Sequence, residues 1–297
     1  IYKKYISGEF FMKKKKFVSF VCGAMLIGAT LTACSSNQST VGIGIDQAKT
    51  VGFMQLANEN KERIWFEVRD SNGDGELSKD DDITYVYRIK GGKADTFMVA
   101  DSSDDDITLS DVKNMNDKDI LSLFKESDKK NFEDWINSDI RGTTDAIKEI
   151  EDTISGNEDW ELTDPEGFQE EKDLLEELNS ILQALNNVTY ESALKLKSNY
   201  PLAAVVETDS SGNHVVTEEV SFKKYTLEHR VGYFDVTENI LQERSNDLEF
   251  QYAITGTIYD QTYKGYYLGD SFLVTSSLDD SVNLGFDTLD TKNVTEE

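Results

Sequence analysis

Basic residues are scarce in this chain of 297 residues. It contains 30 lysines and arginines against 57 aspartates and glutamates, so its formal net charge at pH 7 is −27. A surface with this excess of negative charge repels phosphate backbones, which argues against nucleic acid as a partner because such binding depends on Lys and Arg neutralising phosphates. It also repels anionic lipid headgroups, and it attracts metal cations.

Histidine is nearly absent, and so are the motifs of the commoner catalytic centres. The two histidines are His214 and His229, and the chain has no G-x-S-x-G, H-E-x-x-H or Walker sequence. We attribute the placement of His229 near Asp235 to chance rather than to the catalytic residues of a serine hydrolase. Pairs of carboxylates, as in glycosidases, are unavoidable among so many acidic residues and therefore carry no information. We therefore predict a protein that is not an enzyme.

Long apolar runs are also missing. The run Phe17–Leu31 is shorter than the roughly 20 residues that a helix needs to span the hydrocarbon core of a bilayer. It follows four consecutive lysines, Lys13–Lys16, and ends in small residues, which is the order found in a secretory signal. We therefore predict that residues 12–33 are a signal peptide rather than a retained transmembrane helix.

The end of this segment reads Leu31-Thr32-Ala33-Cys34, which resembles the lipobox of bacterial lipoprotein precursors. The resemblance implies cleavage between Ala33 and Cys34 and attachment of a diacylglyceryl group to the Cys34 sulfur. Two acyl chains hold a protein stably at a bilayer, whereas one chain binds only reversibly. The alternative is an ordinary signal peptide in which the cysteine stands by chance.

Cysteine occupies only two positions, and the resemblance accounts for both. Cys22 would leave with the signal peptide, and Cys34 would carry the lipid as a thioether. The mature protein would then have no free thiol and no disulfide, which excludes cysteine catalysis and thiolate metal sites. Its stability has to come from hydrophobic cores, and a body of about 250 residues can build one or two.

Two short segments flank the predicted signal peptide. Residues 1–11 precede a complete signal that begins at Met12, so we interpret them as an upstream reading frame included by a wrong start assignment. Residues 34–48 begin with the lipidated cysteine and continue with small polar residues, which predict a flexible tether. These features predict a protein anchored to the outer face of the cell membrane. The absence of an outer-membrane cue, together with a further resemblance described below, favours a Gram-positive envelope.

The remaining sequence changes its periodicity twice, which predicts an α+β fold. Residues 49–126 alternate apolar and polar residues, so we expect a small N-terminal antiparallel sheet with two strands in residues 50–70 and a hairpin turn at Gly91-Gly92. Residues 200–297 are rich in aromatic and β-branched residues, which are typical of strands, and predict a C-terminal antiparallel sheet. We expect residues 290–297 to be frayed.

The middle of the chain, residues 127–199, predicts a helical hairpin. Just before it, Asn116 is placed to cap a short helix, and Asp164 with Pro165 marks a later helix start. Between and after these caps, apolar residues recur at three- and four-residue intervals: Phe132, Ile136, Ile140, Ile147, Ile150 and Ile154, then Phe168, Leu175, Leu178, Leu182 and Leu185. We interpret both stripes as core faces of two antiparallel helices.

The sharpest internal motif is DSNGDGELSKDD, residues 70–81, which resembles the calcium-binding loop of EF-hand proteins. The resemblance implies a sharp turn at Gly75 and oxygen ligands at alternating positions. These ligands would be Asp70, Asn72, Asp74, Glu76 through its backbone carbonyl, Ser78 and Asp81. Because Ca²⁺ takes six to eight oxygen ligands, the motif predicts calcium as a cofactor.

Two features separate this loop from an EF-hand. The twelfth position holds Asp81 instead of glutamate, which shortens the reach of the bidentate ligand and should weaken binding. The flanking residues read as strands rather than helices, so the helix opening of calcium sensors is not implied. The alternative is a turn rich in Asp, Asn and Gly that binds no ion.

We interpret the acidic run at residues 101–106 as a solvated loop rather than a second cation site.

A further resemblance is to the N-terminal modules of Gram-positive surface lipoproteins, and it implies no activity. It is carried by the segments RIWFEV, DDDITYVYRIKGGKADTF and ITLSDVKNMNDKDIL.

The leading prediction is a membrane-anchored lipoprotein that binds an envelope protein or polymer without catalysis. Two alternatives stay open: an envelope hydrolase that uses acidic residues, and a ligand-binding subunit of a transporter. The second alternative requires two lobes around a deep pocket, and the uninterrupted helical block argues against it.

Overall fold

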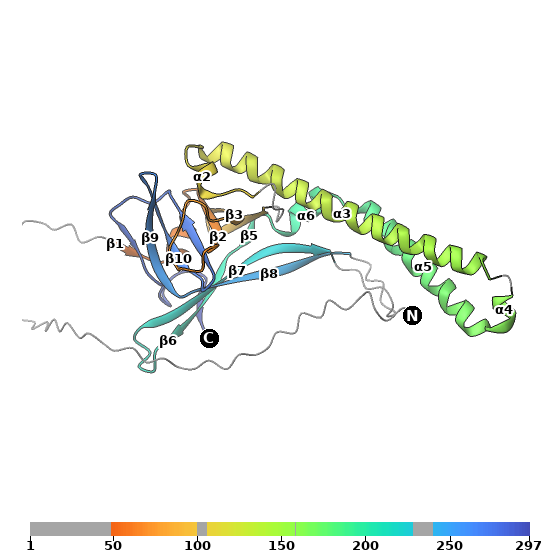
Figure 1. Ribbon diagram of the computed structural model, residues 1–297. Coiled ribbons are helices and arrows are strands. Elements are labelled where there is room, and N and C mark those ends of the chain that lie inside the picture. Colours follow the sequence, from red (N-terminus) through yellow and green to blue (C-terminus); the bar gives the residue numbers. More distant parts are fainter. Residues whose placement is uncertain (1–48, 100–105, 158, 228–239) are drawn as a thin grey trace, which may run out of the picture. The chain divides into compact units, whose positions relative to one another are not determined.

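The computed structural model describes residues 49–99, 106–157, 159–227 and 240–297, which belong to one compact unit, Gln47–Glu297 (Figure 1). These residues form antiparallel sheets. In the sequence, a helical region separates the N-terminal strands from the C-terminal strands. The predicted α+β fold is therefore confirmed. Cys34 lies outside the described residues, as do most of the acidic run 101–106 and residues 228–239 of the region expected to form the C-terminal sheet.

The larger sheet has seven strands, each antiparallel to its neighbours. Their order is β5 (Tyr200–Pro201), β4 (Lys93–Met98), β3 (Ile83–Lys90), β2 (Arg63–Arg69), β11 (Ser271–Thr275), β10 (Gln261–Tyr267) and β9 (Tyr252–Ile258). The N-terminal strands β2–β4 thus share one sheet with the C-terminal strands β9–β11. The two groups are joined by the pairing of β2 with β11, in which Phe66 lies opposite Val274. Gly91 and Gly92 have φ of 61° and 75° and form the predicted turn between β3 and β4.

A second sheet has four strands and comes from the C-terminal part of the chain. Its order is β13 (Val294–Glu296), β6 (Ala203–Thr208), β7 (Val215–Leu227) and β8 (Leu241–Phe250). The expectation of a frayed C-terminus is wrong, because β13 pairs in parallel with β6 and Val294 is buried against Ala204 and Val206. A further parallel pair joins β1 (Lys49–Val51) to β12 (Val282–Leu284).

A short helix, α1 (Phe53–Ala57), lies in the core between the two large sheets. The expectation of a strand at these residues is wrong. Phe53, Met54, Leu56 and Ala57 are all buried, so the segment is apolar on every side and its periodicity cannot distinguish a helix from a strand. The Phe53 ring sits at the centre of this core, with its centroid 5.1 Å from that of Trp65 in β2 and 5.3 Å from that of Phe250 in β8.

The other face of the seven-stranded sheet is covered by helices. Ile64, Phe66 and Val68 of β2 pack in one apolar cluster with Leu109 of α2 (Leu109–Val112) and Phe124 of α3 (Asp117–Ser155). Trp65 faces the core on the opposite side and is only 1% exposed, so β2 is buried on both faces at this residue. Toward the end of the strand, Glu67 on the same face as Trp65 is half-buried and Arg69 is exposed, as the alternation of apolar and polar residues predicts.

The central helices are α3, α4 (Trp160–Thr163), α5 (Pro165–Asn187) and α6 (Tyr190–Leu196), and α3 runs beside α5 in Figure 1. Both predicted caps are present: the Asn116 side chain accepts a hydrogen bond from Asp119 N, and the Asp164 side chain accepts one from Gly167 N. The short helix expected after Asn116 is the first part of one continuous helix, α3. No helix in the described part of the chain is both long and apolar enough to cross a membrane.

The two long helices pack as an antiparallel hairpin. Phe132 and Ile136 of α3 contact Ile181 and Leu185 of α5, in a cluster that also includes Tyr225 of β7. Further along α3, Ile147 and Ile150 pack with Leu178 in a cluster made only of α3 and α5 residues. The hairpin is therefore held to the sheets at one end, and its other end is stabilised by its own apolar stripe.

A buried ion pair joins the hairpin to the sheets. Lys197, which follows α6, forms a salt bridge with Asp128 of α3, and their side chains are 1% and 0% exposed. The Asp128 carboxylate also accepts hydrogen bonds from Met98 N in β4 at 2.9 Å and from the Tyr190 hydroxyl at 2.7 Å. One carboxylate thus connects α3, α6 and β4.

Candidate functional site

The calcium-like loop connects β2 to β3, so it is flanked by strands as the sequence predicts. The Asp70 carboxylate organises its first half by accepting hydrogen bonds from Gly73 N at 2.7 Å and Gly75 N at 2.9 Å. Gly73 and Gly75 have φ of 67° and 73°, a left-handed conformation that glycine adopts without a steric penalty. The expected sharp turn at Gly75 is therefore present.

Asp81 closes the second half of the loop. Its side chain is fully buried and accepts hydrogen bonds from Ser78 N at 2.7 Å and Ser71 N at 3.4 Å. Burial raises the pKa of Asp81, and the nearby charges of Asp70 and Asp74 raise it further. The loop thus brings the three carboxylates among its predicted ligands within electrostatic reach of one another.

The other predicted ligands lie nearer the surface. Asn72 and Glu76 are exposed, and the half-buried Ser78 accepts a weak hydrogen bond on its hydroxyl from Asp80 N. Within the described residues, no group of three or more His, Cys, Asp or Glu side chains is arranged as a metal site. The donor set still fits calcium in kind, because it consists of carboxylate, amide, carbonyl and hydroxyl oxygens.

Leu77 fixes the loop to the sheet, a role that the motif does not predict. Its half-buried side chain packs on the apolar cluster around β2 and lies against Gly256 of β9, where an added Cβ would be 3.4 Å from Leu77 Cδ2. The loop therefore lies directly against β9. The signal that could have revealed this contact is the single apolar residue within a polar loop.

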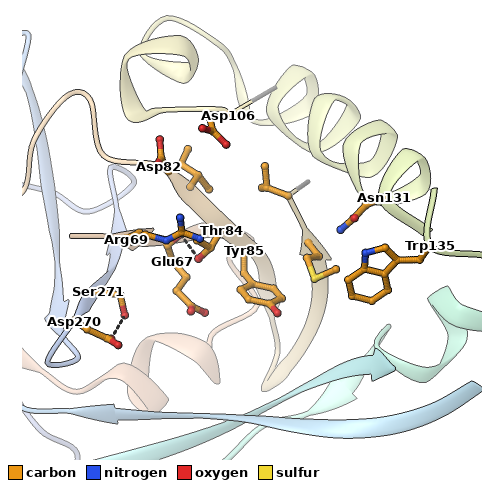
Figure 2. A pocket seen from close by; sticks show the side chains of 13 residues that line it. Glu67, Arg69, Asp82, Thr84, Tyr85, Asp106, Asn131, Trp135, Asp270 and Ser271 are labelled. Carbon is orange, nitrogen blue, oxygen red and sulfur yellow. Dashed lines mark hydrogen bonds between the residues drawn. The ribbon is translucent and has the colours of Figure 1, made fainter. Parts of the chain in front are cut away.

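Beside the loop, the structure has a pocket of about 430 Å³ (Figure 2). Its wall includes residues of β2, β3 and α3, together with Asp270 and Ser271 at the start of β11. Five charged residues line it: Glu67, Arg69, Asp82, Asp106 and Asp270. Tyr85 and Trp135 supply aromatic surface, and Ile83, Met98 and Val99 supply aliphatic surface. The pocket is therefore polar and apolar in similar measure.

Glu67 is the most deeply placed carboxylate of the pocket. It accepts hydrogen bonds from the Tyr87 hydroxyl at 2.5 Å and from Asn246 Nδ2 at 3.2 Å. Burial raises the pKa of Glu67, and these two hydrogen bonds oppose part of that rise. The Tyr87 hydroxyl also accepts a hydrogen bond from Asn246 at 2.8 Å, so the three side chains form one network that holds Glu67 in place.

The aromatic side chains come from two different elements. Tyr85 of β3 stacks on Tyr87 with ring centroids 6.2 Å apart, and burial raises its pKa to about 12, so the hydroxyl stays protonated at neutral pH. Trp135 projects from α3, is 40% exposed, and meets Tyr225 edge to face at 6.1 Å. In Figure 2, Trp135 and Asn131 lie on one side of the pocket and Asp82 and Asp270 on the other.

The loop and the pocket share part of their framework. Arg69 N donates a hydrogen bond to the carbonyl of Asp82 at 2.8 Å, and Asp70 N donates one to the carbonyl of Asp270 at 3.2 Å. The Ser71 hydroxyl also donates to the Asp82 carboxylate at 3.3 Å. A change in the loop's conformation would therefore reach the charged side of the pocket.

Sequence reasoning missed this pocket because its residues come from six separated segments with no shared spacing. The suggested pair of His229 and Asp235 lies outside the described residues. The other histidine, His214, is an exposed residue of the turn before β7, where its ring lies 3.1 Å from the Asp209 carboxylate. No protein family matches this chain, and comparison with curated proteins and with solved structures gave no match.

Proposed function

We propose that this protein is a lipoprotein anchored to the outer face of the cell membrane that binds an envelope component without catalysis. The observation that carries the binding role is the pocket of about 430 Å³, in which charged, aromatic and aliphatic side chains converge. Ligand sites in proteins have volumes of roughly 300–1,000 Å³ and combine an apolar lining with a few placed polar groups. The pocket has both properties.

The proposed anchor is tested by replacing Cys34 with serine in the native host. We expect C34S to lose incorporation of labelled palmitate and to leave the membrane fraction, because serine offers no thiol for the diacylglyceryl group. The matched control is C22S, which changes the other cysteine of the leader and should keep both label and membrane association. Labelled C34S in the membrane fraction would contradict the proposal.

We propose further that residues 70–81 bind calcium, supported by the carboxylates of Asp70, Asp74 and Asp81 and by the turn at Gly75. Since Asp81 replaces the usual glutamate, we expect a dissociation constant of about 1 mM. If calcium binds the folded chain and not the unfolded chain, about 10 mM Ca²⁺ adds about 1.4 kcal/mol to the free energy of unfolding. This gain raises the melting temperature by about 3–6 °C.

D70A should abolish this shift in melting temperature. The matched control D80A removes an exposed aspartate at the eleventh position, which is not a ligand position, and should keep the shift. Scanning calorimetry with and without calcium measures both. An unchanged melting temperature in the parent protein, or an equal shift in D70A, would rule the site out.

An envelope hydrolase is the second candidate function. The observation in its favour is that Glu67, whose pKa is raised by burial, shares one pocket with Asp82, Asp106 and Asp270. A glycosidase needs a protonated carboxyl as general acid and a second carboxylate in the same cleft. Release of reducing ends from purified cell-wall polysaccharide, lost in E67Q, would establish this activity over the binding role.

A further inference from the structure

We infer that the pocket takes a small organic cation, namely a primary amine or guanidinium group carried on an apolar stem. The inference rests on the binding role proposed for this pocket and names the chemical class of its ligand. Two properties of the lining carry it: the sign of its charge, and the separation of its charged side from its apolar side.

The charge of the lining is predominantly negative. Glu67, Asp82, Asp106 and Asp270 contribute carboxylates, and Arg69 contributes the single basic side chain among the lining residues. A neutral or anionic ligand would cover these carboxylates and remove water from them without giving a charge in return, which is unfavourable. An ammonium or guanidinium group supplies both the opposite charge and the N–H donors that carboxylates accept.

The carboxylates lie toward one side of the pocket. Asp82 and Asp270 are on the side nearer the calcium-like loop, while Trp135 lies on the opposite side with Tyr85 between them (Figure 2). The aliphatic side chain of Met98 adds to the apolar surface. A ligand with its cationic head on this carboxylate side of the pocket would therefore place its stem against Tyr85 and Trp135. This arrangement suits an amine with several methylene groups better than a bare ammonium ion or a polyol.

The experiment compares three probes that share one stem and differ in their head group: hexylamine, hexanol and hexanoate. Their binding to the full chain is followed by the indole N–H resonances of its three tryptophans in ¹⁵N-labelled protein. Trp135 lines the pocket, whereas Trp65 lies in the core between the sheets and Trp160 lies in α4, so these two serve as internal controls. A W135F variant assigns the reporter resonance.

We expect hexylamine to shift the Trp135 resonance alone and to bind about tenfold or more tightly than hexanol, with hexanoate weakest. The double variant D82N/D270N should weaken hexylamine binding about tenfold and leave hexanol binding unchanged. The control is D134N, which removes one negative charge from the exposed neighbour of Trp135 that does not line the pocket. It should change the affinity by less than about twofold, because exposed charges are screened by solvent and salt.

A second measurement does not depend on how the double variant folds. Raising NaCl from about 50 to about 500 mM should weaken binding of hexylamine to the parent protein and not that of hexanol. Equal affinity for hexanol and hexylamine, or tighter binding of hexanoate, would overturn the cation inference and leave the proposed binding role standing. If none of the probes moves the Trp135 resonance, both the inference and the role assigned to this pocket are wrong.

Discussion

Replacing Asp128 with alanine is expected to lower the free energy of unfolding by about 3–5 kcal/mol, because it leaves the Lys197 ammonium buried without its partner. The Lys197 side chain is 1% exposed, and burial already lowers its pKa against the opposing effect of Asp128. D128A also removes the acceptor for Met98 N and for the Tyr190 hydroxyl. Urea unfolding at pH 7 measures the loss.

Two further variants separate the ion pair from general damage to α3. D134A changes an exposed aspartate of the same helix and should alter stability by less than about 0.5 kcal/mol. The double variant D128L/K197M removes both charges together and should regain at least about half of the loss, since apolar replacements of a buried pair are often tolerated. A loss below about 1 kcal/mol in D128A would contradict the proposed role of this pair.

The second large effect is expected at Glu218 of β7, which is fully buried beside the fully buried Asp287. Glu218 accepts a hydrogen bond from Asp287 N at 2.8 Å, and the Asp287 carboxylate caps α1 by accepting hydrogen bonds from Met54 N and Gln55 N. Burial, with a further contribution from the charge of Asp287, raises the pKa of Glu218 from 4.5 to about 9. Glu218 is therefore protonated in the folded chain at neutral pH.

The sign of the pH dependence follows from this difference in pKa. Between about pH 4.5 and about pH 9 the folded chain holds a proton on Glu218 that the unfolded chain has lost. Stability therefore falls as the pH rises through this window, by up to about 1.4 kcal/mol per pH unit. E218Q keeps an amide in place of the neutral acid and removes this loss, so it should be more stable than the parent protein by about 2–4 kcal/mol at pH 8.

Unfolding free energies of the parent protein and of E218Q, measured in urea from pH 5 to pH 9, test this expectation. E219Q serves as the control, because Glu219 is the next residue of the same strand and is exposed. It should follow the pH dependence of the parent protein. Curves of equal slope for the parent protein and E218Q would show that the Glu218 carboxyl is not the group responsible.

Local features of this fold could be predicted from sequence, because the interactions that form them are local. Asn116 and Asp164 cap their helices through hydrogen bonds to residues three positions away. The turn at Gly91-Gly92 depends on two adjacent glycines with positive φ. The loop at residues 70–81 is likewise closed by its own carboxylates, so a motif of twelve residues predicted its turn and the neighbouring positions of Asp70 and Asp74.

Features that depend on distant partners could not be predicted in this way. The helix α1 receives its cap from Asp287, and Val294 is buried only because β13 pairs with β6. The pocket has the same origin: Trp135 of α3 and Asp270 come to line one pocket only after the sheets and the hairpin have come together. Periodicity reports how apolar a segment is on each face, and it does not report which segment covers that face.

The order of strands in the larger sheet also determines when this protein can fold. A central strand, β2, has β11 as one neighbour, and the smaller sheet is completed by β13 at the end of the chain. A nascent chain therefore lacks a finished core until synthesis has nearly ended, since long-range pairing must wait for both strands. A chain that completes its core this late is suited to being threaded unfolded through a translocation channel, which is what export to the proposed anchor at Cys34 would require.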